Sequence, residues 1–346
     1  MKKRVLVALS GGVDSAVCAY VLKERGYDVS GIMLRLYDKT ESKDYLDAKA
    51  LCEKLQIDLH YPDYREYFRE QVIDRFAREY MEGKTPNPCV DCNRYVKLPL
   101  VFKYAEEKGF DFVSTGHYAR AVFDENSARN KLLKGLDTKK DQSYVLYNLS
   151  QEYLSRLLLP IGEMSKDEVR KIAEENGFIN ADKKDSQDIC FVEGNYYDYL
   201  KDNCSVVLEA GDFITKDGKV LGRHKGALCY TRGQRKGLGL ALPEPMYVIS
   251  KDMEKNTVTL GFNEDLFERE VFASDVNFVS IKEIKEPISV MARVRYNMTE
   301  QKAKAEILPD GRLRVTFESP QRAVTAGQSL VVYRGDEVLC GGKIIR

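Results

Sequence analysis

Long apolar runs and an excess of charge of either sign are both missing from this sequence. No stretch approaches the roughly 18 apolar residues that a membrane span requires, so we expect no membrane-spanning segment. Lys plus Arg and Asp plus Glu number 54 each, and no net charge attracts nucleic acid to the chain as a whole. Any RNA partner must be held by local groups. Because Met1-Lys2-Lys3 leads into a strand pattern and not into a signal peptide, we expect a cytoplasmic protein.

A second Cys-x-x-Cys pair is also missing. The one pair, Cys89 and Cys92, suits a redox couple or half of a metal site, whereas a zinc site would need a further pair at suitable spacing. In a reducing compartment, eight cysteines indicate catalysis or metal binding more than structural disulfides. Cysteines without such a context are expected to be small apolar core residues: Cys18, Cys52, Cys204, Cys229 and Cys340.

The glycine turn near the N-terminus lacks the Gly-Lys-Ser/Thr of a Walker A loop and the third glycine of a dinucleotide fingerprint. It reads Ser10-Gly11-Gly12-Val13-Asp14-Ser15 and follows the apolar strand pattern Arg4–Leu9. A helix is predicted to begin directly after the glycines, with Ser15 as its cap. Backbone amides, the hydroxyls of Ser10 and Ser15, and a helix N-terminus then converge on one point, which predicts a phosphate site.

Strand and helix patterns alternate through the first part of the chain. Strands are predicted over 28–35, 58–61 and 110–115, and helices over 44–55, 64–80 and 95–108. Such alternation predicts an α/β fold with a doubly wound parallel sheet, whose ligands bind at the carboxyl ends of the strands. Gly116 and Leu34 fall at that edge, where Gly116 lets backbone approach a nucleotide and Leu34 can contact adenine. The alternatives are an ordinary strand-to-loop glycine and apolar strand core.

Short strands and Gly- or Asp-rich turns replace helices after Cys204, a texture typical of small β-barrels. A strand-poor stretch around 262–273 is predicted to separate two such domains. We therefore expect a catalytic domain with a helical connector over 1–204, a central small β domain over 205–270 and a C-terminal barrel over 271–346. In the connector, Ser165 and Glu168 are predicted to form a capping box.

The stretch around the cysteine pair is irregular. Pro86 and Pro88 predict an extended loop, followed by a helix that Asn93 can cap. We expect cysteines near a helix N-terminus and beside Arg94 to have a lowered pKa, which favours the reactive thiolate.

Six segments taken together resemble the tRNA-specific 2-thiouridylase family of pyrophosphate-loop ATPases, in the family's order and over nearly the whole chain. They are Ser10–Ser15, Thr85–Asn93, Thr115–Tyr118, Lys140–Tyr144, Asp185–Phe191 and Gly233–Gly239. Members of this family use ATP to activate the C2 oxygen of the wobble uridine and replace it with sulfur. The resemblance implies an adenine nucleotide alpha hydrolase-like sheet, ATP and Mg²⁺ as cofactors, and two partners: the anticodon stem-loop of tRNA and a sulfur-donor protein.

The resemblance also assigns roles to single residues. Asp14, the nucleophile Cys92 and the persulfide carrier Cys190 are expected to be catalytic. ATP is expected to contact Ala8, Leu9, Ser10, Gly11, Gly12, Val13, Asp14, Ser15, Leu34 and Gly116. The tRNA or its target base is expected to contact Asn87, Pro88, Cys89, His117, Lys140, Asp141, Gln142, Arg295, Tyr296 and Gln328. For Lys140, Asp141 and Gln142, a merely charged turn before a strand-like 144–147 is the alternative.

One residue departs from the family pattern, because many members carry Asp where this chain has Cys89. Three thiols, on Cys89, Cys92 and Cys190, could hold a four-iron four-sulfur cluster with one open iron. A persulfide cycle needs only Cys92 and Cys190, and spacing does not choose between the two. Two other functions remain open at this point: another pyrophosphate-loop synthetase, which gives the thiols no task, and a non-catalytic RNA-binding or sulfur-carrier protein.

Overall fold

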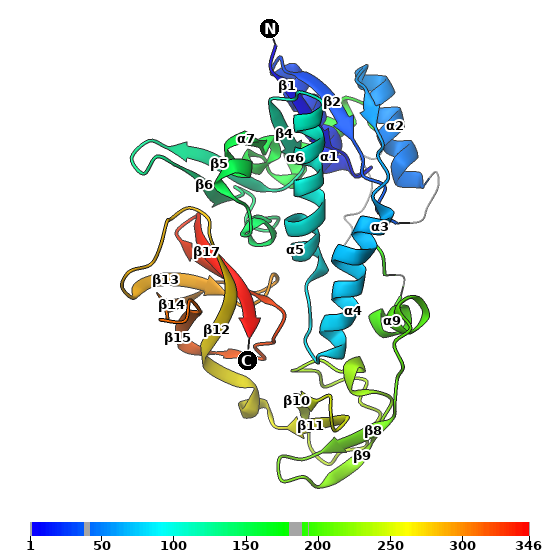
Figure 1. Ribbon diagram of the computed structural model, residues 1–346, viewed down its shortest axis with the longest axis vertical. Coiled ribbons are helices and arrows are strands. Elements are labelled where there is room, and N and C mark those ends of the chain that lie inside the picture. The colour runs from blue at the N-terminus through cyan, green and yellow to red at the C-terminus, as the bar shows by residue number, and fades with distance from the viewer. Residues whose placement is uncertain (1, 38–41, 180–188, 193, 346) are drawn as a thin grey trace.

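The computed structural model describes residues 2–37, 42–179, 189–192 and 194–345 (Figure 1). The described chain forms a parallel sheet covered by helices, a small four-stranded sheet and a closed barrel. None of the described helices is long and apolar enough to cross a membrane. Cys190 is described, whereas most of the Asp185–Phe191 segment, from 185 to 188, lies outside the described residues.

The parallel sheet has the order β3-β2-β1-β4-β7. Its strands are β1 (Arg4–Ala8), β2 (Asp28–Ile32), β3 (Leu59–His60), β4 (Phe112–Thr115) and β7 (Leu157–Leu158). Successive side chains of β1 point to opposite faces, so Val5 and Val7 pack with α1 (Val13–Glu24) and Leu6 packs with α6 (Leu98–Glu107). The predicted doubly wound sheet is confirmed, with β7 as a strand that the sequence patterns did not indicate.

The other helices agree with the predicted ranges, with two corrections. The predicted helix over 64–80 is continuous but has a π-helical turn, Arg69–Ile73, between α3 (Arg65–Phe68) and α4 (Asp74–Met81). The strand-like 144–147 is instead part of a short 3₁₀ helix, Ser143–Leu146. The remaining helices are α2 (Lys43–Leu55), α5 (Pro88–Cys92), the π-helical turn Asn93–Lys97, α7 (Gln151–Arg156), α8 (Lys166–Glu175) and α9 (Tyr196–Cys204).

Two β structures follow the parallel sheet, as the sequence predicts. The first sheet, of order β10-β11-β8-β9, contains β8 (Gly211–Ile214), β9 (Val220–His224), β10 (Tyr247–Asp252) and β11 (Thr257–Gly261). The second comprises β12 (Phe267–Phe278), β13 (Ile288–Arg293), β14 (Gln301–Ile307), β15 (Leu313–Arg322), β16 (Ser329–Arg334) and β17 (Glu337–Ile345). Pairing of β12 with both β15 and β17 closes these six strands into a barrel. The stretch 262–273 is therefore not poor in strands, since β12 begins at Phe267.

A hairpin of the N-terminal half is joined to the barrel. Strands β5 (Ala119–Asp124) and β6 (Arg129–Lys134) pair with each other, and Leu133 of β6 pairs with Glu337 of β17. Figure 1 shows this green hairpin beside the red strand β17. The hairpin, which follows β4 in the chain, therefore extends the barrel's sheet and ties the N-terminal half to it.

A buried ion network strengthens the same junction. Asp141 follows the hairpin, and its Oδ2 accepts from Arg293 Nη2 at 2.7 Å, while Arg293 also lies 3.0 Å from Glu300. Glu300 in turn accepts from Lys134 Nζ at 2.7 Å. The Asp141 side chain is only 3% exposed, and that of Arg293 12%. Removing one partner from such a pair leaves an uncompensated buried charge, which costs about 3–5 kcal/mol.

Replacing Arg293 with Met tests this junction. We expect Arg293→Met to lower the free energy of unfolding by about 3 kcal/mol, because the buried carboxylate of Asp141 loses its cation and Glu300 is left with Lys134 alone. Urea unfolding followed by circular dichroism measures the change. The matched control is Lys285→Met, whose ion pair with Glu283 is 77% and 59% exposed and should contribute less than about 1 kcal/mol. A loss of less than 1 kcal/mol in Arg293→Met would show that the network does not stabilise the junction.

Candidate active site

Two loops meet where the strand order of the parallel sheet reverses. The glycine turn follows β1, and Gly116 follows β4, which pairs with β1. A Cβ on Gly116 would lie 2.8 Å from the backbone nitrogen of Ser15 and 2.9 Å from the carbonyl carbon of Asp14. Position 116 therefore requires glycine because it lies against the backbone of the glycine turn. Its place in the sequence pattern had instead suggested the approach of a nucleotide. In open α/β sheets this reversal point is where ligands bind.

The glycine turn is closed by its serines. The hydroxyl of Ser15 donates to the carbonyl of Gly12 at 3.0 Å and accepts from the backbone N–H of Ser10 at 3.2 Å. Gly12, and not Ser15, is the N-cap of α1, and no described side chain caps it. The prediction that Ser15 caps the helix is thus wrong, but its consequence holds, because the first turn of α1 still directs backbone amides toward an incoming anion.

Asp14 is bound by groups from two other parts of the chain. Tyr118 Oη donates to Asp14 Oδ1 at 2.7 Å, and Lys166 Nζ lies 2.7 Å and 2.9 Å from Oδ1 and Oδ2. The Lys166 side chain is 7% exposed, whereas that of Asp14 is 30% exposed. The sequence patterns singled out Asp14 but neither partner. The one sequence signal near Lys166 was the predicted capping box, because it places the start of α8 at this residue.

His117 and Gln142 are held inside the protein near the same edge. Nδ1 of His117 lies 2.8 Å from Thr115 Oγ1, and burial lowers the pKa of this imidazole to about 3, with a smaller effect from the charge of Lys97. His117 is therefore neutral at physiological pH. Gln142 Oε1 accepts from the backbone N–H of Tyr118 at 3.0 Å. Both side chains shape the loop after β4.

The cysteine pair lies in a helix and not in an extended loop. Asn87 caps α5 by accepting from the Cys89 N–H at 3.2 Å, and Pro88 occupies the first turn, where its missing N–H costs nothing. The predicted extended loop therefore ends at Asn87, and Asn93 is not the cap. Cys89 and Cys190 are exposed, and Cys92 is half-buried.

The segment that carries Cys190 is anchored by an aromatic cluster. The ring of Phe191 lies 5.6 Å from each of the rings of Phe68 and Phe76, and 5.4 Å from that of Tyr199. These T-shaped and tilted contacts place the residue after Cys190 against the long helix, α3 to α4, that leads to α5. The aromatic cluster thereby brings a distant cysteine toward the Cys-x-x-Cys helix.

The three thiols influence one another, and their pKa values are raised. Desolvation by the surrounding protein is the main cause for Cys89, Cys92 and Cys190, even though Cys89 and Cys190 keep an exposed surface. It raises the pKa of Cys190 to about 12, with further contributions from Cys92 and then Cys89. Arg94 does not assist them, because its Nη2 donates to Asp275 Oδ1 on β12 at 2.8 Å. The expectation of lowered thiol pKa values is therefore wrong for this conformation.

The loop before α5 rests on the barrel. Gln328 Nε2 donates to the carbonyl of Thr85 at 2.7 Å, and the N–H of Thr85 donates to Ala326. Arg295 Nη2 donates to Thr325 Oγ1 at 2.7 Å, and Tyr296 Oη donates to the carbonyl of Asp141 at 3.3 Å. The sequence-predicted RNA residues of the barrel thus surround the junction with the catalytic domain.

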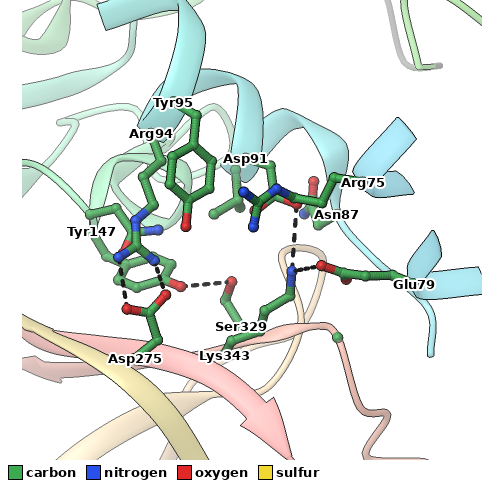
Figure 2. Close-up of a pocket in the computed structure, with 13 residues that line it drawn as sticks. Arg75, Glu79, Asn87, Asp91, Arg94, Tyr95, Tyr147, Asp275, Ser329 and Lys343 are labelled. Carbon is green, nitrogen blue, oxygen red and sulfur yellow. Dashed lines mark hydrogen bonds and ion pairs between the residues drawn. The ribbon is translucent and has the colours of Figure 1, made fainter. Parts of the chain in front are cut away.

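Behind α5, the same junction encloses a polar cavity of about 80 Å³. Figure 2 shows Lys343 of β17 reaching toward Glu79 and Asp91 on one side, and Arg94 reaching toward Asp275 on the other. These charge pairs join helices α4 and α5 to the barrel, so the cavity belongs to the interface that supports the cysteine helix.

Comparison with known proteins identifies the family. Residues 3–194 match the family described as tRNA methyl transferase HUP domain, residues 198–262 the tRNA methyl transferase PRC-barrel domain, and residues 268–344 the aminomethyltransferase beta-barrel domain. The tRNA-specific 2-thiouridylase MnmA of Clostridioides difficile (strain 630) is 45% identical over 355 residues, covering 99% of this chain and 98% of its own. The chain belongs to the tRNA-specific 2-thiouridylase family.

Further relatives agree. The MnmA of Carboxydothermus hydrogenoformans is also 45% identical, with coverage of 99% and 98%, and that of Clostridium acetobutylicum is 43% identical over both full lengths. Among solved structures, the U34-tRNA thiolase NcsA from Methanococcus maripaludis has a TM-score of 0.37 and 19% identity over 58% of this chain and 65% of that one, which carries no functional argument.

These matches cover the parallel-sheet region, the four-stranded sheet and the barrel. They confirm the resemblance on which the residue assignments rest. The assignments themselves remain predictions. Within the described part of the chain, no group of three His, Cys, Asp or Glu side chains is arranged to hold a metal ion.

The raised pKa values predict the pH dependence of thiol reactivity. Since the thiolate is the form that reacts, alkylation of Cys92 and Cys190 by iodoacetamide should rise about tenfold per pH unit from pH 6 to 8.5 without levelling off. Mass spectrometry of the modified peptides measures each site separately, and the solvent-exposed thiol of glutathione serves as the reference. A plateau below pH 7.5 at either cysteine would contradict the burial of these thiols.

Proposed function

We propose that this protein is a tRNA uridine 2-sulfurtransferase that adenylates the C2 oxygen of the wobble uridine and replaces it with sulfur carried by Cys190. One observation carries the proposal: a pyrophosphate-type loop with Asp14 lies at the switch point of the parallel sheet, and the thiols lie within electrostatic reach of the same edge. Lys97 links the two places, because its charge acts on both: it adds to the lowering of the His117 pKa and offsets part of the rise in the Cys92 pKa. The identity to proteins named tRNA-specific 2-thiouridylase supports the substrate.

The glycine turn suits the phosphates of ATP. Gly11 has a φ of +69°, and a Cβ there would lie 2.6 Å from Cα of Asp44. The backbone at Asp44 therefore packs directly against the glycine turn, which only glycine allows. Amides of the first turn of α1 and the hydroxyl of Ser10 would contact phosphate oxygens, with Leu34 and Gly116 near the nucleoside. Asp14 would hold Mg²⁺, which when bound neutralises charge on the phosphates.

The reaction proceeds in two exchanges at C2. The uridine must leave the anticodon stack; its C2 oxygen attacks the α-phosphorus, pyrophosphate departs with the bonding electron pair, and the N3 proton goes to water. The terminal sulfur of a Cys190 persulfide then attacks C2 and AMP departs. Cys92 attacks Sγ of Cys190, which frees 2-thiouridine and leaves a Cys92–Cys190 disulfide. An external thiol reductant and a sulfur-donor protein restore the persulfide.

The described side chains contain no group of three His, Cys, Asp or Glu arranged to hold a metal ion, so they give no support to a four-iron four-sulfur cluster. We therefore propose the cycle without a cluster and assign Cys89 no covalent role. Its exposure and its place in the first turn of α5 support a position beside the target base.

We propose that the anticodon stem-loop lies across the junction between the catalytic domain, residues 1–204, and the barrel, residues 271–346, with residues 205–270 as the central domain. Arg295, Tyr296 and Gln328 on the barrel and Lys140 on the catalytic domain would line this path, together with Asn87 and Pro88 at the start of α5. Asp141 and Gln142 act indirectly, because Gln142 holds the loop after β4 and Asp141 is bound to Arg293 of the barrel.

Cysteine variants separate activation from sulfur transfer. With ATP, bulk tRNA and a cysteine desulfurase, we expect Cys190→Ser to release pyrophosphate in the first turnover at no less than about half of the normal rate while 2-thiouridine falls at least 100-fold, because a hydroxyl cannot carry persulfide sulfur. Cys92→Ser should give the same result, because a hydroxyl cannot free 2-thiouridine from Cys190 by forming a disulfide. Asp14→Asn should lose both products. Nucleoside mass spectrometry and single-turnover pyrophosphate release measure the two steps.

Two further variants control this series. Cys204→Ser changes a half-buried cysteine outside the site and should leave both products unchanged. Cys89→Ala should still thiolate tRNA, and the purified protein should be colourless. Stoichiometric iron with visible absorption, together with loss of thiolation in Cys89→Ala, would overturn the cluster-free cycle.

A further inference from the structure

Several hydrogen bonds fix the position of Lys166, although none of the roles assigned above uses its side chain. It is the first residue of α8, and the Ser165–Glu168 capping box fixes the start of that helix: Ser165 N–H donates to Glu168 Oε2 at 2.7 Å, and Glu168 N–H donates to Ser165 Oγ at 3.2 Å. The N–H of Lys166 donates to Asp137 Oδ2 at 3.0 Å. Side-chain carboxylates on both sides of the turn thus fix the backbone from which Lys166 extends.

The Lys166 side chain then runs inward to the phosphate loop. Its ammonium lies 2.7 Å and 2.9 Å from the two carboxylate oxygens of Asp14, and 5.7 Å from the ring centre of Tyr118. Burying a lysine that is 93% covered costs desolvation and rotamer entropy. Helix α8 already packs on α1 through Val169 and Ala173, which are both fully buried. The packing of α8 therefore does not by itself require a charge at position 166.

We propose that Lys166 binds the β- and γ-phosphates of ATP and remains bound to pyrophosphate as it leaves. This inference rests on the proposed function. An ammonium group has three N–H donors in a compact head, so it can donate to Asp14 with one and to a phosphate oxygen with another. Asp14 stands in the first turn of α1, directly after the glycine turn, and its side chain is more exposed than that of the lysine. The ammonium that it holds therefore lies at the phosphate loop.

The chemistry of the step explains why a fixed cation belongs there. When the uridine C2 oxygen bonds to the α-phosphorus, the bond from that phosphorus to the bridging oxygen breaks, and its electron pair passes to pyrophosphate. Negative charge therefore grows on the leaving group. A preorganised cation at that point stabilises the transition state more than the bound ATP. No proton passes to or from Lys166 in this step.

A purely structural role for Lys166 makes a different prediction. If the lysine only neutralises Asp14 or holds α8 against the loop, its removal should weaken the binding of AMP and of pyrophosphate to a similar extent. If it binds the β- and γ-phosphates, removal should spare AMP, because AMP carries only the α-phosphate.

Calorimetric titration of the full-length protein separates the two. We expect Lys166→Met to raise the Kd of magnesium pyrophosphate at least about tenfold, the loss of one charge-assisted contact, and to change the Kd of AMP less than about twofold. Lys166→Arg should recover most of the affinity. The matched control is Lys171→Met, which removes a 73% exposed lysine from the same helix and should change neither Kd. Tyr118→Phe, which removes the other donor to Asp14, should spare pyrophosphate binding relative to Lys166→Met.

Equal weakening of AMP and pyrophosphate in Lys166→Met, or an unchanged pyrophosphate Kd, would overturn the assignment. These titrations need neither tRNA nor turnover. A wild-type protein that binds pyrophosphate through Lys166 but forms no AMP with tRNA would reject the proposed sulfur transfer and leave this inference standing, so the two can fail separately.

Discussion

The close backbone contact between Gly116 and the start of α1 is the constraint on which the site depends. It brings the loop after β4 to within van der Waals distance of Asp14 and Ser15, so the two loops cannot move independently. Tyr118, two residues on, can then donate to Asp14, and Lys166 of α8 completes the carboxylate's surroundings. A glycine directly after a strand thereby fixes the geometry of a charged cluster at the sheet edge.

The barrel supports the elements around the candidate site, in addition to the RNA-binding role that we propose for it. It pairs with the β5–β6 hairpin, holds Asp141 through Arg293, and accepts the Thr85 loop through Gln328. Figure 2 shows further charge pairs between the cysteine helix and β12 and β17. These contacts lie on both sides of α5. A tRNA that binds the barrel would therefore contact the same elements that position Cys89 and Cys92.

Local patterns predicted local structure well and long-range contacts poorly. Three predicted features depend on a few adjacent residues each, and the structure contains all three: the strand-turn-helix around Ser10–Ser15, the capping box at Ser165, and the change from helices to short strands after Cys204. The partners of Asp14 come from more than 100 residues away, so no periodicity or spacing points to them. The thiol pKa values failed for the same reason: Arg94 is adjacent in sequence, but its guanidinium pairs with Asp275, 181 residues on.

The raised pKa values keep the thiols of Cys92 and Cys190 protonated near neutral pH, which suits an enzyme that should not release sulfur without an activated base. Activation of the C2 oxygen by ATP is therefore the central claim. It is tested most directly with tRNA that carries ¹⁸O at C2 of the wobble uridine. In a single turnover, the account predicts that the label appears in the phosphate of AMP, because that oxygen departs with the α-phosphorus. Unlabelled AMP formed together with 2-thiouridine would contradict it.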